Sequence, residues 1–157
     1  MTDTELIANL ERELQGKILE VKNPEPRRIF MNVTPADMIA CLTQLHDRFG
    51  FSHVSTISGV DAGDVFEVIY HLSAKTTVLN LRVLVPKAEP HFPTATGVLP
   101  GAIFYEREIQ DMFGITVEGI PDPRPLVLPD DWPAGNYPLR KDWSFARPAE
   151  VIPGGKK

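Results

Sequence analysis

Proline divides this chain into two unequal parts, and this division is what most constrains the fold. Eight of the fifteen prolines lie after residue 114, in a segment without a helical or strand period of useful length. Proline has no amide proton and a fixed φ angle, so regular structure does not run through such a segment. The sequence therefore predicts an α+β domain over residues 1–114 and a long extended, proline-rich tail over residues 115–157.

Helical and strand patterns alternate in the first part. A stripe of apolar residues from Leu6 to Leu14 predicts a first helix, and Thr34-Pro35 predicts the start of a second, with threonine as the cap and proline in the first turn. The predicted strands are 18–21, 28–33, 51–58, 65–72 and 77–85, and a last helix is predicted over 101–113.

The turns between the last three strands are short, which implies antiparallel pairing. Pro86, Pro90 and Pro93 are expected to end the sheet. The predicted fold is an antiparallel or mixed sheet with helices mainly on one face.

Composition excludes several classes of protein. The chain has 157 residues and a net charge of −5, which gives no reason to expect nucleic-acid binding. No apolar run approaches the roughly 18–20 residues that span a bilayer. The acidic start, Met1 to Glu5, does not resemble a signal peptide, so we expect a cytoplasmic protein that reaches the membrane only through a partner.

Residues that could carry chemistry are few. Cys41 is the one cysteine, so the chain has no internal disulfide and no ligand set for an iron–sulfur cluster, and Cys41 is expected in the core. The four histidines lack metal-ligand spacing, and no glycine-rich loop or nucleophile elbow occurs. The sequence predicts no catalytic residue, no metal and no cofactor.

Charged residues cluster on the last predicted helix, at Glu106, Arg107, Glu108 and Asp111, and a second acidic pair stands at Asp130-Asp131. One interpretation is a metal or general-acid site in a free-standing enzyme. The other is a salt-bridged helix face. We expect Arg107 to meet either a carboxylate of a partner or a group of the tail.

The tail differs from a simple disordered linker because it carries large apolar and aromatic residues among its prolines. An extended segment with such anchors suits a groove on another chain. The alternative is that the tail wraps its own domain.

One stretch resembles a known family. Residues 105–115 read YEREIQDMFGI, followed by GIPD at 119–122, LVLPDDW at 126–132 and PLRKD at 138–142. This series resembles the signature of the thirty-kilodalton subunit of respiratory complex I, the NADH dehydrogenase. Ile120 stands where the respiratory subunit usually has histidine, and the proline-rich run after it looks more like the homologous subunit of energy-converting [NiFe] hydrogenases. A respiratory NADH:quinone or F420-dependent dehydrogenase subunit is the alternative.

The resemblance implies a cofactor-free structural subunit in the hydrophilic arm of a membrane-bound, ion-pumping redox complex. It would sit peripherally on the cytoplasmic side of the membrane, against the catalytic large subunit and the iron–sulfur subunits. The residues expected at the partner interface are Glu106, Arg107, Glu108, Asp111, Arg124, Asp130, Asp131, Trp132, Tyr137, Arg140, Lys141 and Trp143.

Overall fold

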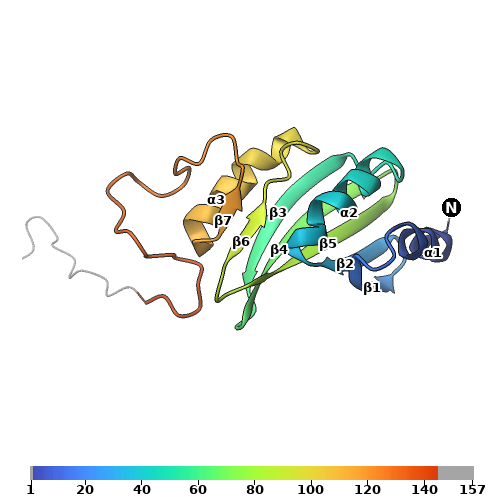
Figure 1. Ribbon diagram of the computed structural model, residues 1–157, viewed down its shortest axis with the longest axis horizontal. Coiled ribbons are helices and arrows are strands. Elements are labelled where there is room, and N and C mark those ends of the chain that lie inside the picture. The colour runs from blue at the N-terminus through green and yellow to red at the C-terminus, as the bar shows by residue number, and fades with distance from the viewer. Residues whose placement is uncertain (1, 145–157) are drawn as a thin grey trace, which may run out of the picture.

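The computed structural model describes residues 2–144. Along the chain its elements are α1 (Asp3–Glu13), β1 (Ile18–Glu25), β2 (Arg28–Val33), α2 (Pro35–Asp47), β3 (His53–Asp61), β4 (Val65–Ala74), β5 (Thr77–Pro86), β6 (His91–Pro93), a 3-10 turn (Pro100–Ala102), α3 (Ile103–Phe113) and β7 (Thr116–Glu118). Figure 1 shows helices and sheet forming one body, with the tail extending from the end that carries α3. The predicted α+β class is confirmed.

The main sheet has five strands in the order β1-β2-β5-β4-β3. The β3–β4 and β4–β5 pairs are antiparallel, as their short turns predicted. At the centre β2 runs parallel to β5, and β1 pairs antiparallel with β2 at the edge. The sheet is therefore mixed, because the chain must cross over through α2 between β2 and β3.

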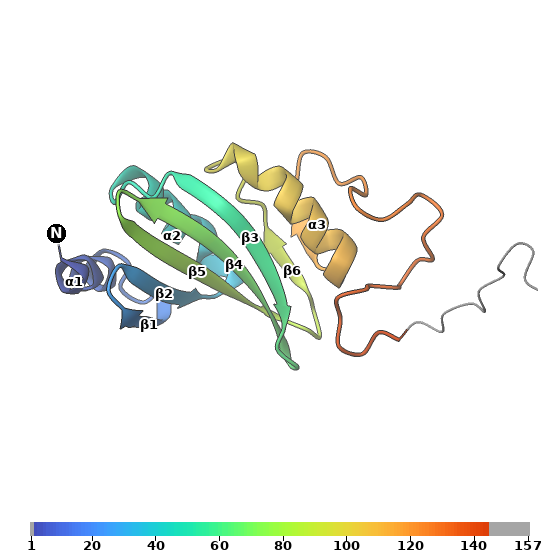
Figure 2. The same cartoon turned by 180° about the vertical axis from the view of Figure 1, so that it is seen from behind.

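Helix α2 covers one face of this sheet. Thr34 caps it by accepting a hydrogen bond from the Asp37 amide at 3.3 Å, and Pro35 opens its first turn. The buried stripe of α2 includes Met38 and Cys41, which confirms the core position expected for the cysteine. Figure 2 shows the opposite face of β3, β4 and β5 with no helix in front of it.

Helix α3 lies against the edge strand β3 because Gly59 has no side chain. A Cβ at Gly59 would come within 2.4 Å of the Phe113 ring and 2.8 Å of Ile109. Phe113 in turn packs edge-on against Phe66 of β4, with ring centroids 5.9 Å apart. This close approach positions α3, the helix that carries most of the charged cluster.

A second, two-stranded sheet was not predicted. β6 pairs in parallel with β7, so that His91 lies opposite Thr116 and Pro93 opposite Glu118. Pro93 therefore lies within a strand, although the main sheet does end at Pro86. Three-residue strands are too short to show an alternating pattern, and their pairing across the intervening helix leaves no local signal.

After β7, residues 119–144 contain neither helix nor strand. This described part of the tail leaves the body beside α3 and later returns toward it (Figures 1 and 2). The remainder of the predicted tail, residues 145–157, lies outside the described residues. Within residues 2–144 no helix has the length and apolar character needed to cross a membrane.

Candidate partner interface

Glu106 of α3 is completely buried, and the hydrogen-bond partners of its carboxylate lie within its own domain. Its carboxylate accepts hydrogen bonds from the Tyr70 hydroxyl at 2.7 Å, the Ala95 amide at 2.7 Å and the Thr94 hydroxyl at 2.5 Å. Burial raises the pKa of Glu106, and the three donors oppose that rise. Glu106 thus ties α3 to β4 and to the loop after β6, and its carboxylate faces its own chain rather than an outer surface.

Arg107, the next residue, points to the tail. Its guanidinium lies 3.2 Å from the Asp122 carboxylate and donates to the carbonyls of Arg124 at 2.8 Å and Pro125 at 3.0 Å. Of the two partners predicted for Arg107, the structure shows the tail group. The Asp122 carboxylate also accepts a hydrogen bond from the Arg124 side chain. This hydrogen bond, together with the positive charge of Arg107, lowers the pKa of Asp122.

Asp111, one turn further along α3, holds the next part of the tail. One carboxylate oxygen accepts the amide protons of Leu126, Val127 and Leu128, at 2.8, 2.8 and 3.3 Å. Three consecutive amides can converge on one oxygen only if the backbone curls around it, as in the anion-binding loops called nests. Asp111 therefore fixes the shape of residues 126–128.

The C-terminal end of α3 anchors the tail a second time. Gly114 ends the helix at φ +64, and a Cβ there would lie 2.3 Å from the Tyr137 ring. Arg140 donates to the Phe113 carbonyl at 2.6 Å while its guanidinium stacks over the rings of Phe66 and Tyr137. Glycine is thus needed here both for the left-handed backbone and for the approach of Tyr137.

A third anchor reaches the end of β3. The Asp61 carboxylate accepts hydrogen bonds from Lys87 Nζ and from the Lys141 amide, both at 2.9 Å. The Lys87 hydrogen bond is the largest cause that lowers the Asp61 pKa to about 2. The Lys141 side chain itself is exposed.

The tail also has a small aromatic cluster of its own. Trp132 and Trp143 lie with ring centroids 6.3 Å apart, and Trp132 Nε1 donates to the Asn136 carbonyl at 2.8 Å. With Asp111 and Tyr137, Trp132 lines a pocket of about 250 Å³ between the tail and α3. Trp132, Tyr137 and Trp143 are all half-buried within the chain.

Several large apolar side chains of this region remain in solvent. Leu126 is 42% exposed, Val127 51%, Leu139 53% and Phe104, on the outer side of α3, 59%. Glu108, Asp130 and Asp131 are exposed as well. Side chains of this size and number on one ordered region are typical of a protein–protein contact surface.

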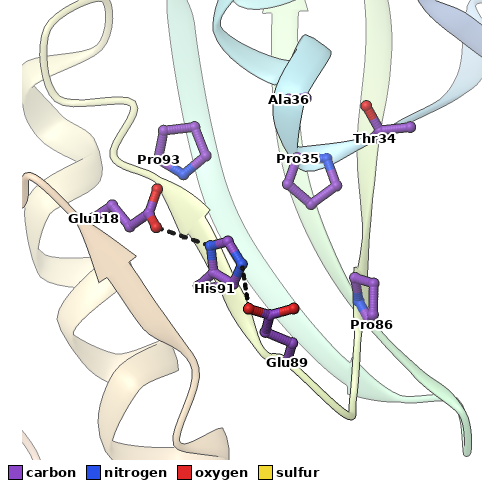
Figure 3. A pocket seen from close by; sticks show the side chains of 8 residues that line it. All are labelled: Thr34, Pro35, Ala36, Pro86, Glu89, His91, Pro93 and Glu118. Atoms are coloured by element: carbon purple, nitrogen blue, oxygen red, sulfur yellow. Dashed lines mark ion pairs between the residues drawn. The ribbon is translucent and has the colours of Figure 1, made fainter.

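A separate pocket of about 430 Å³ lies between the start of α2 and the second sheet (Figure 3). Pro35, Pro86 and Pro93 form apolar walls around His91. The His91 imidazole lies 2.9 Å from Glu118 and 3.9 Å from Glu89. The contact with Glu118 links β6 to β7, which gives this histidine a structural role.

The carboxylates considered for a free-standing enzyme do not converge. Glu106 faces the interior, Asp111 caps the tail, and Glu108, Asp130 and Asp131 face solvent. Among residues 2–144 no three acidic, histidine or cysteine side chains gather in a metal-binding arrangement. The sequence had pointed to Arg107 and Asp111, whereas the anchoring roles of Asp61 and Gly114 were missed.

The fold and this region define a class: a small α+β domain that carries an ordered C-terminal arm alongside its last helix. The family model for "Respiratory-chain NADH dehydrogenase, 30 Kd subunit" matches residues 31–149, and the chain belongs to this family.

The relatives include subunits of NADH-quinone oxidoreductases and a component of a hydrogenase. A subunit of the NADH-quinone oxidoreductase of Rhizobium rhizogenes is 35% identical over 151 residues, covering 92% of this chain and 74% of the relative. Hydrogenase-4 component G of Escherichia coli is 33% identical over 147 residues, covering 87% of this chain but 26% of that longer protein.

Among solved structures, a chain of the membrane-bound sulfane sulfur reductase, an archaeal respiratory membrane complex, is similar with a TM-score of 0.79 and 25% identity. The match covers 90% of this chain and 85% of that chain. A trypsin-resistant fragment of Nqo5 shares the fold, with a TM-score of 0.64 over 78% of this chain and 99% of the fragment.

Proposed function

We propose that this protein is a cofactor-free structural subunit in the hydrophilic arm of a membrane-bound, ion-pumping redox complex. It lies on the cytoplasmic side of the membrane, and its α3–tail region docks on the catalytic large subunit next to the iron–sulfur subunits. Membership of the thirty-kilodalton subunit family supports the assignment to a multisubunit redox complex.

The observation that carries the docking role is the contrast between backbone and side chains in the tail. The tail backbone is fixed by Arg107, Asp111 and Asp61, whose charged groups form strong hydrogen bonds. Leu126, Val127 and Leu139 nevertheless stay in water. A segment that is ordered before it binds loses less conformational entropy on binding, and its exposed apolar groups gain the burial energy.

The kind of complex is the finer part of the proposal. We favour an energy-converting hydrogenase, since the chain matches hydrogenase-4 component G and is 50% identical to formate hydrogenlyase subunit 5 of Escherichia coli over 64 residues, which cover 41% of this chain and 11% of that protein. The second candidate is a respiratory NADH:quinone oxidoreductase, which the long match to the oxidoreductase of Rhizobium rhizogenes favours.

The test is co-purification with the large subunit of the same complex. The full chain and a chain lacking residues 119–157 are each expressed with a tagged large subunit, and each is melted alone. We expect the shortened chain to fold, because no side chain of residues 119–144 is fully buried, and to be lost from the complex. Equal recovery of both chains would contradict the docking role, and unfolding of the shortened chain would show that the tail serves its own domain.

A further inference from the structure

A cavity on the uncovered face of the main sheet lies apart from the α3–tail region. The β1–β2 turn closes one side of it, and its volume is about 440 Å³. Cavities of about 300–1,000 Å³ are typical of small-molecule sites. Its walls include Glu25, Arg27, Arg28, Phe30, His71 and Val78.

The turn that carries the two arginines is held in a defined shape. Arg27 has φ +65, a left-handed conformation that side chains other than glycine and asparagine seldom adopt. Its amide donates to the Asp3 carboxylate at 2.6 Å, and its carbonyl accepts from the Val78 amide at 2.9 Å. The Asn23 side chain bridges the turn by donating to the carbonyls of Glu25 and Arg28. Residues with a strained backbone occur most often at active sites and ligand-binding sites, which makes the Arg27 turn a candidate binding site.

Two carboxylates lie near the two arginines of this turn, Asp3 at the Arg27 amide and Glu25 at the Arg28 side chain, but the Arg27 side chain is not paired with either. Among residues 2–144 the Arg27 guanidinium has no hydrogen bond or ion pair, and Arg28 has only a 3.5 Å contact with the exposed Glu25. The neighbouring cations on this face are better paired, Lys22 with Glu20 at 2.8 Å and Arg82 with Glu67 at 3.3 Å. Two guanidinium groups at one cavity match the oxygen pairs of a carboxylate or phosphate.

The opposite wall combines apolar Phe30 and Val78 with the polar side chains of His71 and Asn80. The Phe30 ring is braced by Arg82, whose guanidinium lies 5.5 Å from the ring centroid. The His71 ring is fixed on both sides, with Nδ1 2.6 Å from Asn80 Oδ1 and Nε2 3.0 Å from Ser58 Oγ. Because Asn80 Nδ2 donates to the Ile29 carbonyl, its oxygen faces His71, so Nδ1 carries the proton and Nε2 accepts from Ser58.

We propose that this cavity binds a small organic ligand that has a planar apolar body and an oxyanion, either carboxylate or phosphate. The body lies against Phe30, His71 and Val78, and the oxyanion meets Arg27 and Arg28. This site is independent of partner docking, because none of its walls belongs to α3 or the tail.

Phenyl phosphate is a suitable probe, titrated into the ¹⁵N-labelled full chain and followed by two-dimensional NMR. We expect saturable shifts centred on the amides of residues 27–30, 71 and 78. Loss of one charged hydrogen-bonding group should weaken binding by about tenfold in Arg27→Asn, which suits the left-handed backbone, and in Arg28→Gln. Arg12→Gln, on the exposed side of α1, is the matched control and should bind as the wild type does.

Two further probes test the chemistry. Inorganic phosphate lacks the planar body and benzylamine lacks the anion, so both should bind at least about tenfold more weakly than phenyl phosphate. The proposal is overturned if phenyl phosphate gives no saturable shifts, if both arginine variants bind it as the wild type does, or if either simpler probe binds equally well.

Discussion

The body and the tail of this protein are ordered by different interactions. In the body, large side chains such as Leu10, Met38 and Tyr70 are fully buried. In residues 119–144 every side chain is half-buried or exposed, and the backbone is held by charged side chains that reach out from the body. The comparison teaches that an ordered segment need not have a core of its own, and that its apolar side chains then remain available to a partner.

The largest effect is expected in the body, at Glu106. Replacing it with alanine leaves the Tyr70 hydroxyl, the Thr94 hydroxyl and the Ala95 amide without their acceptor, and should lower the free energy of unfolding by about 3–5 kcal/mol. Chemical denaturation of the isolated chain measures this loss.

Glu106→Gln is the matched control. Its amide oxygen can still accept from Tyr70 and Ala95, and its amide nitrogen can donate to Thr94. Burial raises the pKa of Glu106 in the folded state. Ionisation of this carboxyl therefore lowers the stability of the fold as the pH rises above the pKa that Glu106 has in the unfolded chain. Glutamine does not ionise, so the Glu106→Gln variant should lack this loss. Equal losses in the alanine and glutamine variants would contradict a hydrogen-bonding role.

The next effect is at the junction of body and tail. Gly114→Ala should cost about 1–2 kcal/mol for the left-handed backbone and should also displace Tyr137, which a Cβ would contact at 2.3 Å. We expect faster hydrogen exchange and proteolysis across residues 137–141, with the sheet still folded. Gly16→Ala has the same backbone penalty at φ +78 with nothing within 4 Å, so it should leave the tail protected.

Asp111 should matter within the tail alone. Asp111→Ala removes the common acceptor of the amides of residues 126–128, so the hydrogen-exchange rates of these amides should rise. The free energy of unfolding of the whole chain, measured from the main melt, should fall by less than about 1 kcal/mol. Glu108→Ala, an exposed carboxylate on the same helix, should change neither. A large drop in the main melt for Asp111→Ala would mean that body and tail unfold as one unit.

The smallest expected effect is a loss of hydrogen-exchange protection in the tail at acidic pH. The folded-state pKa of Asp61, about 2, lies below its ordinary value of 3.8, so its contribution is fully present above the ordinary value and is lost as the pH falls through about 2. Protection of the Lys141 amide should therefore fall between about pH 4 and pH 2. Asp61→Asn should remove most of this pH dependence, and an unchanged profile would show that Asp61 does not hold the tail.

The sequence predicted most of the body because its signals are local. Thr34-Pro35 starts α2, the strands that form the β3–β4–β5 meander are separated by short turns, and Gly114 ends α3 as predicted. The β6–β7 pairing was missed because each strand has only three residues and α3 separates the two strands in the sequence.

The interface was harder to predict because the sequence does not show which group a charged side chain will contact. Glu106, Arg107 and Asp111 were grouped by sequence, yet the helix directs the first into the core and the other two toward different parts of the tail. Gly59 and Asp61 carried no sequence signal, since their roles depend on contacts with α3 and with residue 141.

The measurement that tests the central claim most directly is the affinity of the full chain for the large subunit when only the exposed apolar side chains of the tail are changed. In a Leu126→Ser, Val127→Ser, Leu139→Ser chain the tail anchors remain, so its melt and tail protection should match the wild type. We predict binding weakened by at least about a hundredfold, from the loss of three apolar contacts each contributing about 1 kcal/mol or more. Unchanged affinity with an ordered tail would contradict the account.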